Sequence, residues 1–341
     1  MIQIIVSLAS LIADIYAVGL LLYLLLRFVF RDRFPLLALL NNFAPWYFLP
    51  LVVFLPLGLL LREQWLIVLM LVLTAIALLW FGPYYLPKRS AKSVERPLLR
   101  VLTFNIWGDN PCKPEIGTWL REVNADIVFL QEIPKSFILN ELPRLLDIYP
   151  YQFGPIAEGE WWNSVTLSRY PIVSAKDLLA WDIGVPGLHN AVIDIDGQLI
   201  STYNVHMVLP FKLRGARGVF AAINRALHYD ERERRRKIGQ MLDFLRGERN
   251  PFIVAGDFNM SCYSALYGDI AKLAVDSFRE AGKGFGMTWP ISVADHQFGI
   301  QMPILRIDYL WHSPELRAVE ITQLSRFGSD HLPLLATIQR N

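Results

Sequence analysis

Side chains able to bind a metal ion and to move protons follow the apolar runs of this sequence from Asn105 onwards. They are Asn105, Glu132, His206, Asp257, Asn259, Asp308, Asp330 and His331. Hard divalent cations such as Mg²⁺ take one or two carboxylates together with water and substrate oxygens. Hydrolysis of a phosphate ester also needs a group that positions the attacking water and donors for the developing charge. These residue types therefore predict metal-dependent hydrolysis of a phosphate ester.

The elements that must position these side chains are short β-rich runs that alternate with helical ones after Pro97. Strands are predicted at 99–105, 127–131, 164–168, 191–195, 199–206, 252–255, 307–311 and 334–338. Helices are predicted at 115–123 and 231–245. This alternation predicts an α/β sandwich of sheets flanked by helices. Most of the candidate residues then fall at strand ends.

Three apolar stretches, at 2–30, 36–61 and 65–86, precede the predicted sandwich. Each reaches the roughly 20 residues that an α-helix needs to cross a bilayer. Pro45, Pro50 and Pro56 lie in the second stretch and predict a kinked helix. The predicted organisation is a three-span transmembrane module at 1–86, a short basic linker at 87–96 and a catalytic domain at 97–341.

The basic residues that flank the spans predict the orientation. The first loop contains Arg31 and Arg33, and the segment after the third span contains Lys88, Arg89, Lys92 and Arg96. By the positive-inside rule, this multi-pass protein of the cell membrane would hold its catalytic domain on the cytoplasmic side. An extracytoplasmic domain stays the alternative, because long domains cross largely regardless of flanking charge.

The charge of the catalytic domain argues against nucleic acid as a partner. The whole chain has a formal net charge of +2, but the basic excess lies in the anchor and linker, and the remainder has slightly more acids than bases. Proteins that grip nucleic acid without sequence preference rely on neutralising many phosphates. Membrane lipids, with a phosphorylated lipid or headgroup as substrate, are the favoured partners, and no protein partner is inferable.

The motifs around the candidate residues resemble those of the endonuclease/exonuclease/phosphatase superfamily, and they occur in the family's order. They lie at 102–106, 129–132, 203–206, 253–259, 306–309 and 329–331. The architecture is similar to that of membrane-anchored bacterial members of the neutral sphingomyelinase-like and teicoplanin-resistance-like types. The resemblance implies a DNase I-like sandwich of two sheets and a Mg²⁺ cofactor, with Mn²⁺ as the alternative.

The resemblance also implies a metal site and a group that handles the water. Glu132 would be the main metal carboxylate, with Asn105 beside it, and Asp330 would complete the metal site. Asp257 would orient or deprotonate the attacking water, and Asn259 would hold a phosphate oxygen. Considered alone, Asn105 could instead be a strand-end turn residue, and Asp257 and Asn259 could belong to an ordinary polar turn.

Two histidines complete the implied catalytic set. His206 would donate to the phosphate in the transition state, and His331 would contact the scissile phosphate. Asp308 would hydrogen-bond to the imidazole of His331 and determine its tautomer. One departure stands beside this match. Several nuclease members carry an acid two residues after the first Asn, where this chain has Trp107.

The segment between His206 and the long predicted helix mixes apolar and basic residues. Phe211, Arg214, Arg217 and Phe220 represent this pattern. Such a mixture suits a lip that dips into lipid headgroups while its bases meet lipid phosphates. An ordinary amphipathic packing helix fits the pattern equally well. Trp161 and Trp162 either join this lip or lie in the core.

The run of basic residues at 232–237 opens the long predicted helix and is interleaved with acids. This pattern favours a solvated, ion-paired helix face over a nucleic-acid patch. The sequence as a whole predicts a membrane-anchored phosphatase or phosphodiesterase that acts on a lipid-linked phosphate or a phospholipid headgroup. The alternatives are a membrane-tethered nuclease and a catalytically inactive binding module.

Overall fold

A computed structural model describes residues 2–86, 98–154, 163–180, 186–210, 224, 226–290 and 302–340. The chain divides into two compact units. Of the described residues, one unit contains 2–86, 224, 226–229 and Tyr263–Ala265. The other contains all twelve strands that the described residues form, and it carries every candidate catalytic residue.

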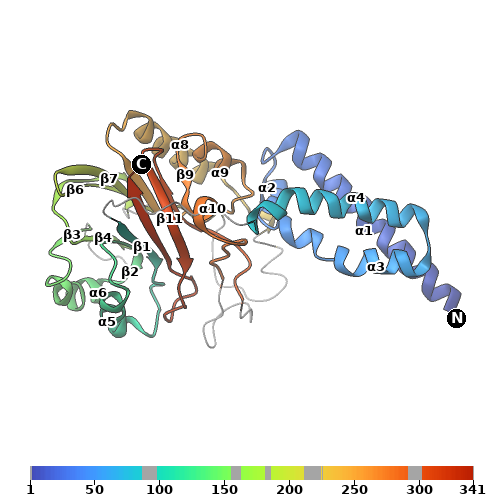
Figure 1. Cartoon of the computed structure of the whole chain (residues 1–341), viewed down its shortest axis with the longest axis horizontal. Helices are drawn as coiled ribbons and strands as arrows, with labels where there is room; N and C mark the ends of the chain where they lie inside the picture. Colours follow the sequence, from blue (N-terminus) through green and yellow to red (C-terminus); the bar gives the residue numbers. More distant parts are fainter. Residues whose placement is uncertain are drawn as a thin grey trace. The chain divides into compact units, whose positions relative to one another are not determined.

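The first unit is made of apolar helices (Figure 1). Three stretches are long and apolar enough to cross a membrane, namely Val6–Phe30, Ala44–Leu61 and Gln64–Tyr84. The elements that form this unit are α1 (Ile2–Phe30), α2 (Pro35–Asn41), η1 (Ala44–Phe48), α3 (Leu51–Leu61), α4 (Gln64–Phe81) and η2 (Gly82–Tyr84).

The second apolar stretch is not the single kinked helix that the sequence predicts. The helix ends at Asn41, resumes as the short 3₁₀ helix η1, and becomes α-helical again only at Leu51. Pro45 lies in the first turn of η1, and Pro50 directly precedes α3. Proline lacks the backbone N–H that a continuous helix needs at these positions. Pro56 alone is accommodated inside α3.

The second unit is built around two six-stranded sheets (Figure 1). One sheet has the order β11-β12-β1-β2-β4-β3 and the other has the order β5-β6-β7-β8-β10-β9. The bounds in the first sheet are β1 Leu99–Asn105, β2 Ile127–Ile133, β3 Tyr151–Phe153, β4 Asn163–Ser168, β11 Leu316–Gln323 and β12 Leu334–Arg340. Those in the second are β5 Ile172–Ala180, β6 Pro186–Ile195, β7 Gln198–His206, β8 Phe252–Asp257, β9 Val275–Asp276 and β10 Asp308–His312.

Alternating side chains along the strands divide the apolar core into layers. In β1, Val101 belongs to a core shared with Ile253 of β8 and Leu310 of β10, which lie in the other sheet. The neighbouring residues Leu102 and Phe104 point the other way, into a cluster beneath the helices. Because successive side chains of a strand face opposite sides, one strand supplies both layers. Each sheet is therefore buried on both faces.

Helices cover the outer face of each sheet (Figure 1). The first sheet is covered by α5 (Lys113–Val123), α6 (Lys135–Asn140) and η3 (Leu142–Leu145), whose apolar residues share its outer cluster. The second is covered by α8 (Arg232–Gly247) and α9 (Ala265–Ile270), and α10 (Ser277–Ala281) packs beside β11. This architecture confirms the predicted DNase I-like α/β sandwich.

Candidate active site

The strand ends bring the candidate residues to one edge of the sandwich. Asn105 and His206 are the last residues of β1 and β7, and Asp257 ends β8. The parallel pairing of β7 with β8 sets His206 opposite Asp257, and the antiparallel pairing of β10 with β8 sets Asp308 there too. Strands from both sheets therefore converge on one site.

The amide of Asn105 connects two carboxylates from opposite sheets. Its Nδ2 donates to Glu132 Oε1 at 3.0 Å and to Asp257 Oδ2 at 3.1 Å. Its Oδ1 accepts from the backbone N–H of Trp107 at 3.1 Å. The amide thus presents its donors to the carboxylates, so its geometry suits holding them in place beside a metal.

The turn after β8 depends on a glycine. Gly256 has φ +144°, and a Cβ there would lie 1.9 Å from the Val205 carbonyl oxygen of the adjacent strand. The turn is closed by Asn259, whose backbone N donates to Asp257 Oδ1 at 2.8 Å. Its side-chain Nδ2 donates to the Met207 carbonyl at 2.8 Å and to Asp257 Oδ2 at 3.3 Å. The amide of Asn259 therefore orients Asp257, and it can reach a phosphate oxygen only if one of these bonds opens.

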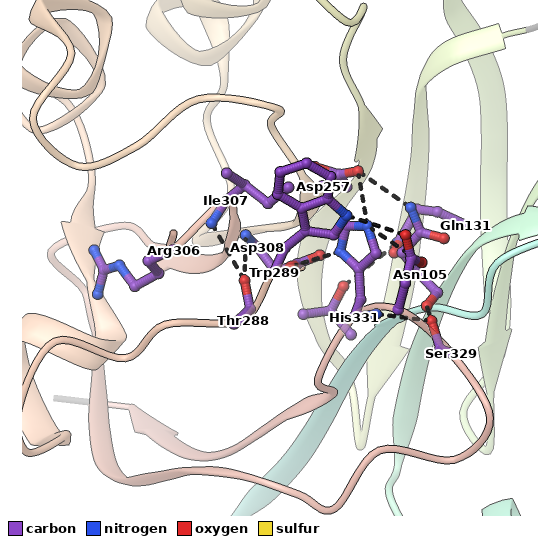
Figure 2. Close-up of polar contacts among 12 residues, drawn as sticks. Asn105, Gln131, Asp257, Thr288, Trp289, Arg306, Ile307, Asp308, Ser329 and His331 are labelled. Carbon is purple, nitrogen blue, oxygen red and sulfur yellow. Dashed lines mark hydrogen bonds and ion pairs between the residues drawn. The ribbon is translucent and has the colours of Figure 1, made fainter. Parts of the chain in front are cut away.

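His331 lies between carboxylates, as Figure 2 shows. Its Nδ1 is 2.9 Å from Asp308 Oδ2, the contact that the resemblance implies. Its Nε2 is 3.9 Å from Asp257 Oδ2 and equally far from Asp330 Oδ1. Trp289 Nε1 donates to Asp330 Oδ2 at 3.1 Å. The imidazole is therefore held on one side and faces the site with its other nitrogen.

The loop that carries His331 is tied to β1. Ser329 Oγ donates to the Asn105 carbonyl at 2.8 Å and accepts from the His331 backbone N at 3.0 Å. Thr288 Oγ1 accepts from the backbone N of Asp308 at 3.3 Å. These hydroxyls hold the backbone beneath both members of the Asp308–His331 pair (Figure 2).

Burial and neighbouring charge shift the pKa values of the two histidines in opposite directions. Burial, together with the smaller effect of the nearby His331, lowers the pKa of His206 to about 3. Burial also acts to lower the pKa of His331, but Asp308, Asp330 and Asp257 together raise it well above its ordinary value. At neutral pH, His206 is therefore neutral and His331 carries a positive charge.

The carboxylates shift in the opposite direction. Burial, together with the smaller effect of the charge of Asp330, raises the pKa of Glu132 to about 8, and the hydrogen bond from Asn105 opposes this rise. Burial raises the pKa of Asp257 as well, while the charge of His331 opposes the change. Concentrated negative charge of this kind favours either proton uptake or a bound cation.

Two groups of side chains bring ligand atoms within 4.8 Å of one another. They are Glu132, His206 and Asp257, and Asp257, Asp308 and His331. In the first group, the carboxylates of Glu132 and Asp257 offer the oxygen ligands that a hard cation such as Mg²⁺ or Mn²⁺ takes, while the neutral imidazole of His206 stays available to the substrate. In the second group the imidazole is positively charged and already bonded to Asp308, which disfavours a cation. Glu132 and its neighbours are therefore the better metal site.

The basic run at 232–237 differs in part from the predicted solvated face. Arg236 is exposed and pairs with Glu233, as expected, but Arg234 and Lys237 are each only 1% exposed. Arg234 pairs with Glu231 and donates to the carbonyl of Asn259. The signal for this burial was present in the sequence. Arg234 precedes Ile238, Met241 and Leu245 at helical spacing, so it shares their apolar face.

Sequence reasoning also gave no role to two buried amides, Gln131 and Asn204, although both lie inside the motifs at 129–132 and 203–206. Arg306, by contrast, points away from His331 in Figure 2 and pairs with Asp276. Both cysteines are free thiols. The proposed lipid-facing residues Phe211, Arg214, Arg217 and Phe220, as well as Trp161 and Trp162, lie outside the described residues.

The family model of the Endonuclease/Exonuclease/phosphatase family matches residues 102–331. The chain therefore belongs to this family, whose named activities all cleave phosphate esters. The match spans the sandwich from β1 to His331, and the two-sheet fold agrees with it.

Solved structures support the same fold. An endonuclease/exonuclease/phosphatase from Bacteroides vulgatus is 20% identical with a TM-score of 0.55, covering 72% of this chain and 100% of its own. TDP2 from Caenorhabditis elegans is 18% identical with a TM-score of 0.55, covering 71% of this chain and 74% of its own. No protein with a curated function matches the chain.

Proposed function

We propose that this protein is a membrane-anchored, Mg²⁺-dependent phosphatase or phosphodiesterase that acts on a lipid-linked phosphate or a phospholipid headgroup. The observation that carries the proposal is that one chain joins a phosphoester hydrolase fold to three membrane-length apolar helices. A headgroup substrate is already confined to the membrane surface, so an enzyme anchored there meets it without leaving the bilayer.

Glu132 would hold the metal, with Asn105 orienting its carboxylate and Asp330 nearby. A bound Mg²⁺ ion supplies Lewis-acid stabilisation of the phosphate oxygens. The elevated pKa of Asp257 makes it a stronger base than an ordinary aspartate, so it suits orienting or deprotonating the attacking water. The water oxygen bonds to phosphorus as the bond to the leaving oxygen breaks, and the water proton passes to Asp257.

The two histidines would stabilise the charge that develops on the phosphate. Protonated His331 presents Nε2 to a phosphate oxygen, while Asp308 holds Nδ1. Neutral His206 would donate a hydrogen bond from Nε2 to the phosphate. This nitrogen lies 3.6 Å from Glu132 Oε1, so it faces the metal site. Donors that are already oriented in a buried site need little reorganisation during reaction. Asn259 would hold a phosphate oxygen when substrate displaces one of its present bonds.

The first test is turnover by the whole chain purified in detergent. Mg²⁺-dependent release of phosphate or headgroup would be measured on lipid phosphates and phospholipids, with single-stranded and duplex DNA alongside and His331→Ala as the control. We expect lipid turnover that the variant loses. Cleavage of DNA alone would establish the membrane-tethered nuclease instead. Absence of turnover on every substrate would leave the inactive binding module as the better account.

We also propose that the catalytic domain faces the cytoplasm from the cell membrane, on the basis of the basic flanks around the spans. A protease-accessible tag at the C-terminus tests this placement in intact cells and in inverted vesicles. Protection in cells and cleavage in inverted vesicles is the expected result. Cleavage in intact cells would place the domain outside.

A further inference from the structure

Glu132 lies on an irregular part of β2. The antiparallel pairing of β2 with β4 runs as far as Leu130 opposite Val165 and resumes only at Ile133 opposite Asn163. Two residues of β2, Gln131 and Glu132, therefore oppose one residue of β4. Such a β-bulge interrupts the ladder and redirects a side chain.

The backbone at this bulge has an unfavourable conformation. Glu132 has φ +55°, in the left-handed region that residues with a Cβ rarely occupy. A conformation of this kind persists where the surroundings over-determine it, and it often occurs at functional sites. The contacts around the bulge should therefore include groups that stabilise it.

A side chain from the opposite sheet reaches the bulge. Asn204 of β7 donates through Nδ2 to the carbonyl of Leu130 at 3.3 Å and to that of Val165 at 3.0 Å. These are the two carbonyls of the last regular pair before the break. Asn204 is only 1% exposed. Its amide thus ties β7 to both strands that form the bulge.

The bulge contributes its own residue to the same connection. Gln131 Nε2 donates to Asn204 Oδ1 at 2.8 Å and lies 3.4 Å from Thr103 Oγ1. Gln131 directly precedes Glu132, and Asn204 lies two residues before His206 on the same face of β7. Gln131 Oε1 is the one atom of these two amides that has no hydrogen-bond partner among the described residues. Buried hydrogen bonds between side chains of this kind hold their surroundings in place.

We infer that Gln131 and Asn204 are positioning residues that bridge the two sheets and hold the Glu132 bulge, so that its carboxylate meets Asn105 and the metal. The inference rests on the proposed metal-dependent function. It assigns these amides no contact with substrate. Their effect passes through the orientation of Glu132, as outer partners commonly act on metal ligands.

The test is Mg²⁺ binding to the whole chain in detergent, measured by calorimetry without substrate. Asn204→Leu and Gln131→Met remove the bridge at nearly constant volume. We expect each to weaken Mg²⁺ binding by about 10- to 100-fold, the usual effect of losing an outer partner of a metal ligand. Because the two amides act as one unit, the double variant should lose little more than either single variant.

Thr202→Val is the matched control. Thr202 lies two residues before Asn204, is fully buried, and donates only within its own sheet, to the Ala191 carbonyl at 2.8 Å. Its loss should lower the denaturant midpoint while leaving Mg²⁺ affinity within about twofold, the error of such a comparison.

Unchanged Mg²⁺ affinity in Asn204→Leu would overturn the inference. An equal loss of Mg²⁺ affinity in Thr202→Val would also overturn it, because the loss would then reflect general stability. Failure of the proposed function gives a different pattern. Wild-type protein that binds Mg²⁺ but hydrolyses no phosphate ester would remove that function, while the comparison of variants would still decide the role of the bridge. Wild-type protein that binds no Mg²⁺ would contradict both.

Discussion

The charge of His331 depends on three nearby carboxylates. Asp308 accepts from its Nδ1 on one side, while Asp257 and Asp330 lie near Nε2. A second pair in the same domain has the same form. His312 Nε2 lies 2.9 Å from Glu280 Oε2, beyond the other end of β10. The two pairs allow the effect of a carboxylate on the site to be separated from its effect on the fold.

Asp308→Asn should lower turnover by about 10²-fold or more, as the loss of an oriented transition-state group does elsewhere. The neutral amide no longer favours the imidazolium, so the pKa of His331 should fall toward its ordinary value. NMR titration of the histidine ring measures that fall. Glu280→Gln, which changes the other pair, should leave turnover and the pKa of His331 unaltered. Retained activity in Asp308→Asn would contradict the assigned role.

Proton release on metal binding follows from the environment of Glu132. Since burial raises its pKa to about 8, the carboxyl is mostly protonated at pH 7, and a metal must displace that proton. We expect Mg²⁺ affinity to rise as pH increases from 6 to about 8 and to level off above it. Calorimetry at pH 7 in buffers of different ionisation enthalpy measures the released proton. Glu132→Gln should abolish it, and buffer-independent heats in the wild type would contradict the prediction.

At the scale of the elements, α8 supports the turn that follows β8. Arg234 lies on the buried face of this helix, and its guanidinium donates to the Asn259 carbonyl. Glu231, one turn earlier, pairs with the same guanidinium. The turn itself holds Asp257. The position of a catalytic carboxylate thus depends on a helix that contributes no residue to the site.

Arg234→Met keeps the length of the side chain and removes the guanidinium, leaving Glu231 buried without this partner. Loss of one member of a buried ion pair costs about 3–5 kcal/mol. Denaturant unfolding should show a loss of this size. Arg236→Met, on the exposed face of the same helix, should cost no more than about 1 kcal/mol. Equal losses in the free energy of unfolding of the two variants would show that the buried ion pair of Arg234 stabilises the fold no more than the exposed pair of Arg236.

At the scale of the whole molecule, a buried histidine outside the catalytic set makes stability depend on pH. His189 of β6 is 1% exposed, and burial lowers its pKa to about 4. The unfolded chain, with a pKa near 6.5, binds a proton that the folded chain excludes. The resulting stability is complete above about pH 6.5 and is lost as the pH falls toward 4.

His189→Leu should therefore flatten the pH dependence of the free energy of unfolding between pH 6.5 and 4. The contribution is at most roughly 3 kcal/mol, from 1.36 kcal/mol per pKa unit. Denaturant unfolding at a series of pH values measures it. The variant of exposed His228, His228→Leu, should retain the wild-type slope. A wild-type slope in His189→Leu would contradict the prediction.

The sequence by itself determined the class of fold, the three membrane-length stretches and most of the candidate residues. Strand periodicity and apolar length are local properties, so β1 is found with the predicted bounds, and the other predicted strands are found with ends that differ by up to five residues. The strands β3, β5, β9 and β11 were not predicted. The strand-end positions of Asn105, His206 and Asp257 are equally local. The order of the family motifs along the chain is also a property of the sequence alone.

Only the tertiary structure decided the contacts between distant residues. The amide of Asn105 reaches carboxylates 27 and 152 residues away, and Asn204 reaches a bulge in the other sheet. The sequence contains the prolines of the second stretch, but only the structure shows that the helix is interrupted around Pro45 and Pro50 and continues through Pro56. The charged neighbours of Arg234 predicted a solvent-exposed side chain, but the helix face that it shares with Ile238 is buried. The partners of these side chains are determined by the packing of residues that lie far apart in the sequence. A local sequence pattern holds no information about that packing.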